Sequence, residues 1–146
     1  MTIIYNAKIP SVGLCTIEIE HNTFKNVRVQ PSLTKPPAKA IDLATLDNCK
    51  PQLHVDAAQA TILPGGVDVH VHSRAPGFPQ KETWESLESG AFTGGVTSLI
   101  DMPNTKPPTL DMDSVQEKWA LAEKTRLRYR FLVGVTEANL EKIPQL

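Results

Sequence analysis

From residue 63 onward the sequence alternates between apolar, strand-like stretches and amphipathic, helix-like stretches. The patterns predict strands and helices in alternation, with strands over 67–72, 96–102 and 129–135, helices over 82–93 and 111–126, and the start of another helix at 138–143. Such alternation is typical of a parallel sheet or barrel made of βα units. A complete eight-unit barrel takes about 250 residues. The predicted fold class is therefore α/β, either a small open sheet or, as we favour, the start of a (β/α)8 barrel.

The first 62 residues have a different pattern and predict a small β-rich domain, followed by the βα units of residues 63–146. Apolar residues alternate over the first 30 positions, which predicts short antiparallel strands joined by turns at 10–13 and 21–22. Three prolines make residues 31–50 a long, stiff connection, and residues 52–62 are again expected to be extended.

Composition excludes several classes of function. Among 146 residues, 15 Lys and Arg balance 16 Asp and Glu, so neither nucleic acid nor a membrane is expected as a partner. No apolar run approaches the roughly 20 residues of a membrane helix, and the first residues do not resemble a secretory signal. Cys15 and Cys49 show no metal-knuckle spacing, and we expect both to be reduced, in a cytoplasmic protein.

The predicted strand at 67–72 carries His70 and His72 among apolar residues. Side chains two positions apart on a strand share a face, so both imidazoles can reach one metal ion. Asp68 has the same parity and could orient a ligand histidine. The alternative is that the histidines are ordinary polar residues of a solvated strand. Two histidines are fewer than the three or four ligands that zinc usually takes.

Two further polar residues follow the ends of successive predicted strands. Arg74 can bind a carboxylate through both arms of its guanidinium, and Asn104 would lie beside it, because active sites of α/β folds gather at the carboxyl ends of strands. The alternatives are a surface salt bridge for Arg74 and a turn for Asn104. Asp101 is better interpreted as a buried carboxylate satisfied by backbone N–H groups.

The remaining residues of these types are given structural roles. We expect His21 and His54 to be surface or structural residues, and the tryptophans Trp84 and Trp119 to anchor the core from their helices. The pair Gly94 and Gly95 has no phosphate-loop spacing and predicts a turn from helix to strand.

Residues 63–77 resemble the first signature of the dihydroorotases of the amidohydrolase superfamily, and residues 102–108 resemble their second conserved block. Residues 81–82 and 94–97 also fit, so the resemblance covers roughly 61–110. The resemblance implies a metallo-dependent hydrolase barrel of the TIM type, preceded in the chain by a small β-domain. His70 and His72 would be zinc ligands for one or two ions, and Arg74 and Asn104 would bind the substrate carboxylate.

The activity implied by the resemblance is the reversible cyclisation of N-carbamoyl-L-aspartate to dihydroorotate in pyrimidine biosynthesis. The remaining metal ligands and the catalytic aspartate lie on later strands in this family, so no catalytic residue is expected within these 146 residues and the chain alone is expected to be inactive. The sequence departs from the family at Ser73, usually aliphatic, and at Ala75, usually glutamate. We expect these changes to alter loop packing more than chemistry.

Two other interpretations stay open. Allantoinases and hydantoinases share the paired histidines, and Trp84 with Glu85 resembles allantoinases, although the combination of Arg74 and Asn104 favours dihydroorotase. Alternatively, the chain is a non-catalytic, dihydroorotase-like subunit that scaffolds aspartate transcarbamoylase. A homo-oligomer is a further possibility.

Overall fold

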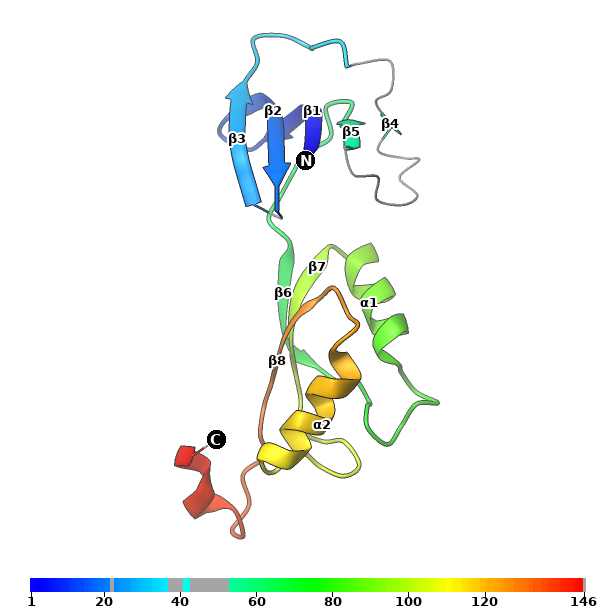
Figure 1. Ribbon diagram of the computed structural model, residues 1–146, viewed down its shortest axis with the longest axis vertical. Helices are drawn as coiled ribbons and strands as arrows, with labels where there is room; N and C mark the ends of the chain where they lie inside the picture. Colours follow the sequence, from blue (N-terminus) through cyan, green and yellow to red (C-terminus); the bar gives the residue numbers. More distant parts are fainter. Residues whose placement is uncertain (22, 37–40, 43–52, 146) are drawn as a thin grey trace. The chain divides into compact units, whose positions relative to one another are not determined.

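The computed structural model describes residues 1–21, 23–36, 41–42 and 53–145 (Figure 1). Backbone contacts divide the chain into two compact units, Met1–Pro64 and Gly65–Leu146. No helix in the described ranges is long and apolar enough to cross a membrane.

The first unit is a five-stranded sheet in the order β3-β2-β1-β5-β4. The strands are β1 (Thr2–Ile9), β2 (Gly13–Glu20), β3 (Thr23–Val29), β4 (Ile41–Asp42) and β5 (Leu53–Asp56). The predicted antiparallel pairing of the first three strands is confirmed, whereas β5 runs parallel to β1. A small core buries Ala7, Cys15, Ile17 and Ala57. Cys49 lies outside the described residues.

The two histidines of this unit lie as expected. His21 is exposed, and the Nδ1 atom of His54 lies 3.2 Å from the hydroxyl of Tyr5. Neither observation indicates that His21 or His54 is a metal ligand.

The second unit confirms the predicted alternation of strands and helices. Its elements are β6 (Gly66–Val71), α1 (Trp84–Thr93), β7 (Val96–Asp101), α2 (Met112–Ala122) and β8 (Arg128–Phe131), and the three strands form a parallel sheet in the order β6-β7-β8. The last predicted helix is instead a 3-10 helix, Leu140–Gln145. Figure 1 shows both helices beside this sheet.

Local sequence explains where both helices begin. Thr83 and Asp111 are N-caps, and each accepts a hydrogen bond from the backbone N–H of the serine three residues later. These contacts satisfy amides that lack helical partners, which stabilises each helix by about 1 kcal/mol. The side chain and backbone N–H of Ser114 also hold the pKa of Asp111 below its ordinary value. Gly94 caps the end of α1, and Gly95 adopts a φ of 75° in the predicted turn.

The core of this unit confirms one predicted anchor and corrects the other. Trp84 is buried with Leu99, Ala122 and Leu127, whereas Trp119 is 49% exposed. The hydrophobic pattern of α2 predicts a buried stripe of Met112, Val115, Trp119 and Ala122, and the structure confirms Val115 and Ala122. Met112 and Trp119 are exposed instead, and the third buried position of the helix is Lys118, which a hydrophobic pattern does not select.

Two strand predictions also need correction. β6 was expected to be buried, yet Val67 and Val69 are 64% and 62% exposed, because β6 is an edge strand of the described sheet. β8 ends at Phe131 rather than at residue 135. The Leu132 amide still donates to the carbonyl of Asp101 in β7, whereas the Gly134 amide donates to the carbonyl of Thr109, so the chain has left the ladder by residue 134.

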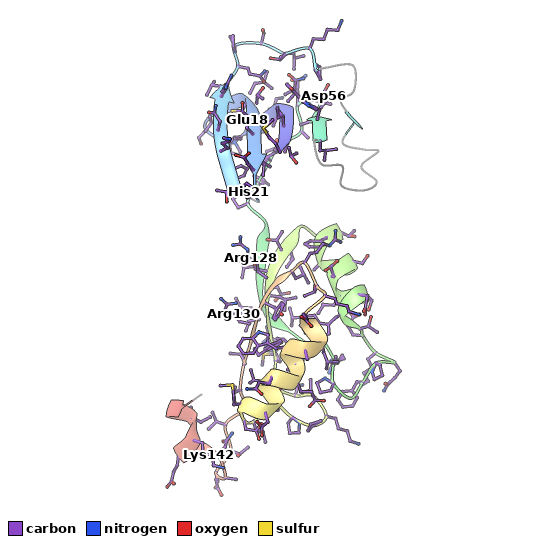
Figure 2. The ribbon with its side chains drawn as sticks, in the orientation of Figure 1. Glu18, His21, Asp56, Arg128, Arg130 and Lys142 are labelled. Atoms are coloured by element: carbon purple, nitrogen blue, oxygen red, sulfur yellow. The ribbon has the colours of Figure 1, made fainter. Side chains whose placement is uncertain are left out.

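β8 presents two chemically different faces. Tyr129 and Phe131 pack against Trp84, with ring centroids 5.7 and 6.2 Å from it. Arg128 and Arg130 alternate with these aromatic residues and project outward, exposed, from the strand (Figure 2). This alternation is the period of two expected of a strand with one packed face.

Glu88 of α1 organises the connection between α2 and β8. Its carboxylate accepts hydrogen bonds from the Thr125 hydroxyl (2.8 Å) and from the backbone and guanidinium of Arg126. The Arg126 backbone N–H, the Thr125 hydroxyl and the Arg126 guanidinium lower the pKa of Glu88. Because these groups hold residues 125 and 126 outside the helix, α2 ends at Ala122 and not near residue 126 as predicted.

We expect Glu88→Gln to lower the urea midpoint of the chain at pH 7. The loss of unfolding free energy should be about 0.2–1 kcal/mol, which is small because Arg126 is largely exposed and solvent weakens its interaction with Glu88. A carboxyl group whose pKa is lowered by folding stabilises the fold above its unfolded pKa, and this contribution is lost as the pH falls through the folded value. The difference between the variant and the wild type should therefore shrink toward pH 3. Glu117→Gln, at an exposed position of α2, is the control, and an equal difference at both pH values would contradict the assignment.

Candidate functional site

The predicted site residues lie at the carboxyl ends of β6 and β7. The imidazole rings of His70 and His72 have centroids 5.3 Å apart and are tilted by 60°. His70 is exposed and lines a pocket of about 400 Å³ between β6, β7 and α1, and His72 is half-buried. The structure therefore brings the two predicted ligands together, with their rings side by side.

Asp68 lies beside His70, and both residues line the same pocket. Between Asp68 and Val71 the register of β6 shifts by one residue against β7, where Asp68 pairs with Leu99 and Val71 with Asp101. The Asp68 carboxylate accepts a hydrogen bond from the backbone N–H of His70 (3.0 Å). This recorded contact is with the strand backbone, and the predicted contact with an imidazole is not among the recorded ones.

His72 and Asn104 bring the two loops of the site together. The Nδ1 atom of His72 lies 2.7 Å from Oδ1 of Asn104. With the Asn104 amide oxygen as the acceptor, Nδ1–H of His72 is the donor of this hydrogen bond, and in the neutral ring Nε2 then has the free lone pair. That is the tautomer in which Nε2 can ligate a metal ion while Nδ1–H is held by a neighbour. The contact also leaves the Asn104 NH₂ group available to donate to an anion.

Arg74 is half-buried and has a φ of 63°, in the left-handed region that residues other than glycine seldom adopt. In the part of the chain that the structure describes, no group pairs with its guanidinium. A half-buried guanidinium with free donors suits a carboxylate ligand. The structure places Arg74 in the same loop as His72 but records no direct contact between Arg74 and Asn104.

The residue between His72 and Arg74 explains how this loop is held. Ser73 is fully buried, and its backbone N–H and hydroxyl donate to Oδ1 (2.8 Å) and Oδ2 (2.9 Å) of Asp101. Asp101 was predicted to be a buried carboxylate satisfied by backbone N–H groups. It is fully buried, but it has only one such donor among its recorded partners.

The main partner of Asp101 was missed by the sequence analysis. The Nζ atom of Lys118, on α2, lies 2.6 Å from Oδ2 of Asp101, donates to the carbonyl of Met102 (2.8 Å), and lies over the Phe131 ring. Both side chains of this ion pair are 0% exposed. An aspartate inside an apolar strand is itself a signal, because a buried charge requires a partner, and Lys118 lies on the following helix between the buried Val115 and Ala122.

The described residues do not form a complete metal site. Two imidazoles with one fixed tautomer suit zinc, but zinc takes three or four ligands. Across the described ranges, no group of three or more His, Cys, Asp or Glu residues is placed to hold an ion. His70 and His72 therefore fit as two members of a larger ligand set.

Comparison with known structures defines the class of fold. The chain superimposes on L-hydantoinase from Arthrobacter aurescens with a TM-score of 0.73 and 24% identity, covering 99% of this chain and 30% of that protein. It matches D-hydantoinase from a Thermus species with a TM-score of 0.65 and 22% identity, covering 98% of this chain and 31% of that protein. The mixed α/β fold of this chain is thus one that occurs in hydantoinases.

The sequence relatives are more specific, and they are dihydroorotases. The chain is 42% identical over 92 residues to that of Methanosarcina acetivorans, covering 63% of this chain and 20% of the relative. It is 54% identical over 72 residues to that of Halobacterium salinarum, covering 49% and 17%. The resemblance to dihydroorotases inferred from the motifs is confirmed. The chain spans about a fifth of the length of these relatives, and no family model matches it.

Proposed function

We propose that this chain contributes the β6 and β7 side of the active site of a dihydroorotase, which interconverts N-carbamoyl-L-aspartate and dihydroorotate. The observation that carries the proposal is the 2.7 Å contact between His72 and Asn104. It joins the two motifs that resemble dihydroorotases, and it places the Asn104 amide group beside an imidazole that could bind a metal ion. The identity of 35–54% to dihydroorotases supports the same conclusion.

In this proposal, His70 and His72 bind zinc and Arg74 and Asn104 bind the substrate carboxylate. Zinc, when bound, acts as a Lewis acid and lowers the pKa of water, which suits attack on a ring amide. Arg74 offers the guanidinium fork and Asn104 the NH₂ group, so the substrate is held by its anionic end beside the histidines. The catalytic residue and the remaining ligands are assigned to parts of the parent enzyme outside these residues.

We further propose that the β6-β7-β8 sheet is the first part of a (β/α)8 barrel and that residues 1–62 form a separate small β-domain. The exposed valines of β6 support this, because contiguous exposed apolar surface marks a place where another element packs. In a closed barrel, the edge of β6 would pair with another strand.

Two alternatives are decided by the same assay. Hydantoinase or allantoinase activity is compatible with the structural similarity to hydantoinases, and a non-catalytic subunit that binds aspartate transcarbamoylase is compatible with the partial ligand set. The complete gene product should be assayed with dihydroorotate, hydantoin and allantoin. Turnover of dihydroorotate supports the proposal, turnover of only hydantoin or allantoin supports the first alternative, and absence of turnover by a folded, zinc-loaded protein supports the second.

The zinc assignment has its own test. We expect His70→Ala to lower the zinc affinity of the complete protein by more than about 100-fold, because loss of a direct ligand exceeds the effect of losing an outer contact. Elemental analysis after dialysis against a weak chelator measures the bound zinc. His21→Asn is the matched control, since asparagine tolerates the φ of 49° at that exposed position. Undiminished zinc in His70→Ala would refute the assignment.

A further inference from the structure

The proposed function does not use the most deeply buried charges of the molecule. Ser73, Asp101 and Lys118, here called the buried ionic cluster, are each 0% exposed. They come from three different elements, namely the loop after β6, the end of β7 and the middle of α2. Their polar atoms are joined by hydrogen bonds of 2.6 to 2.9 Å.

Stability alone does not account for this cluster. Desolvation of two charges offsets most of their attraction, and replacing a buried ion pair by apolar residues is often neutral or stabilising. What an ion pair offers beyond an apolar contact is direction, because charge-assisted hydrogen bonds impose geometry on both partners. The hydrogen bonds of this cluster are made to the two loops that carry the candidate site.

The first loop is held through Ser73. One carboxylate binds its backbone N–H and its hydroxyl, so both position and orientation are set for the residue between His72 and Arg74. Arg74 follows in a left-handed conformation, which is unfavourable for residues other than glycine and persists only where the surroundings enforce it. The two hydrogen bonds that the adjacent Ser73 donates to Asp101 constrain the backbone in this way.

The second loop is held through Lys118. Its ammonium donates to Asp101 and also to the carbonyl of Met102, two residues before Asn104. The same segment is tied to the first loop by the Met102 amide, which donates to the Val71 carbonyl (2.8 Å), and by the Lys106 amide, which donates to the Pro76 carbonyl (3.1 Å). Lys118 thus holds the end of β7 directly. It also holds the Asp101 carboxylate, which in turn holds the loop after β6 through Ser73.

We propose that the buried ionic cluster is the positioning device for the substrate-binding loops after β6 and β7. Its members do not touch substrate, and they act by setting the conformation of Arg74 and the place of Asn104. The serine at position 73, where dihydroorotases usually have an aliphatic residue, is part of this device, since an aliphatic side chain cannot donate to Asp101. The inference rests on the proposed carboxylate-binding role of these loops.

The kinetic test uses Ser73→Ala in the complete gene product, because this change removes only the hydroxyl and keeps the backbone N–H. We expect KM for N-carbamoyl-L-aspartate to rise about 10-fold, as for loss of one charge-assisted hydrogen bond, with kcat and zinc content nearly unchanged. Ser89→Ala, at an exposed position of α1, is the matched control. In an Arg74→Ala background, Ser73→Ala should have a smaller effect on KM, because the guanidinium that Ser73 helps to position is absent.

An unchanged KM in an otherwise active enzyme, or an equal effect with and without Arg74, would overturn the positioning role. A second measurement tests the positioning role without requiring enzyme activity, so it distinguishes failure of this inference from failure of the proposed function. In the 146-residue chain, we expect the Ser73 amide to be protected from hydrogen exchange and to exchange at least about 10-fold faster in Lys118→Met. Protection that is absent, or that is unaffected by Lys118→Met, would also overturn the inference.

Discussion

Replacing Asp101 by alanine is expected to destabilise the Gly65–Leu146 unit by about 3–5 kcal/mol, the largest effect on folding that we predict. The carboxylate is the counter-ion of the fully buried ammonium of Lys118 and the acceptor for two donors of Ser73. Its removal leaves a desolvated positive charge and a buried N–H without their partner. Urea unfolding followed by tryptophan fluorescence reports this unit, because both tryptophans lie within it.

The double variant is the control for this effect. Adding Lys118→Met to Asp101→Ala removes the unpaired charge and should recover part of the lost stability, because replacing both partners by apolar groups costs less than removing one. Lys118→Met alone should be milder, since Asp101 keeps its hydrogen bonds to Ser73. Additive losses in the double variant would show that the two side chains do not form a coupled pair. If Asp101→Ala does not fold, comparison of Asp101→Asn with Asp101→Asn/Lys118→Met gives the same test.

The parts of the fold that follow from local sequence were predictable. The alternation of βα units, the N-cap at Asp111 and the turn at Gly94 each depend on a few neighbouring residues, and the structure confirms them. The paired imidazoles were predicted from the alternation of side chains along a strand. The rule that parallel strands end at the same edge of a sheet predicted Asn104 near the loop after β6, beside Arg74, and the recorded contact of Asn104 is instead with His72 of that loop.

The remaining features depend on contacts that no local pattern contains. The extra residue in β6 reflects how β6 pairs with β7, and the early end of α2 reflects the hydrogen bonds of Glu88 to residues 125 and 126. Lys118 was missed because a hydrophobic pattern assigns every lysine to solvent. Lys118 is buried because it pairs with Asp101. Its burial could therefore have been predicted only by pairing these two charged residues, which lie in different elements.

Arg74→Ala is expected to raise KM for N-carbamoyl-L-aspartate about 100-fold in the complete gene product, since losing one partner of a desolvated charge pair costs 2 kcal/mol or more. Zinc content should stay unchanged, because the guanidinium is not a ligand. Alanine has the same left-handed backbone penalty as arginine at a φ of 63°, so the variant isolates the side chain.

Two further variants determine what Arg74 supplies. Arg74→Lys keeps the charge but loses the planar fork, and an intermediate KM would show that two-armed binding contributes beyond charge alone. Arg28→Ala removes an arginine from the other unit, where it pairs with Glu18 at the surface, and should leave KM unchanged. If Arg74→Ala leaves KM unchanged while the enzyme remains active, the substrate carboxylate is bound elsewhere, and the buried ionic cluster loses the residue that it is proposed to position.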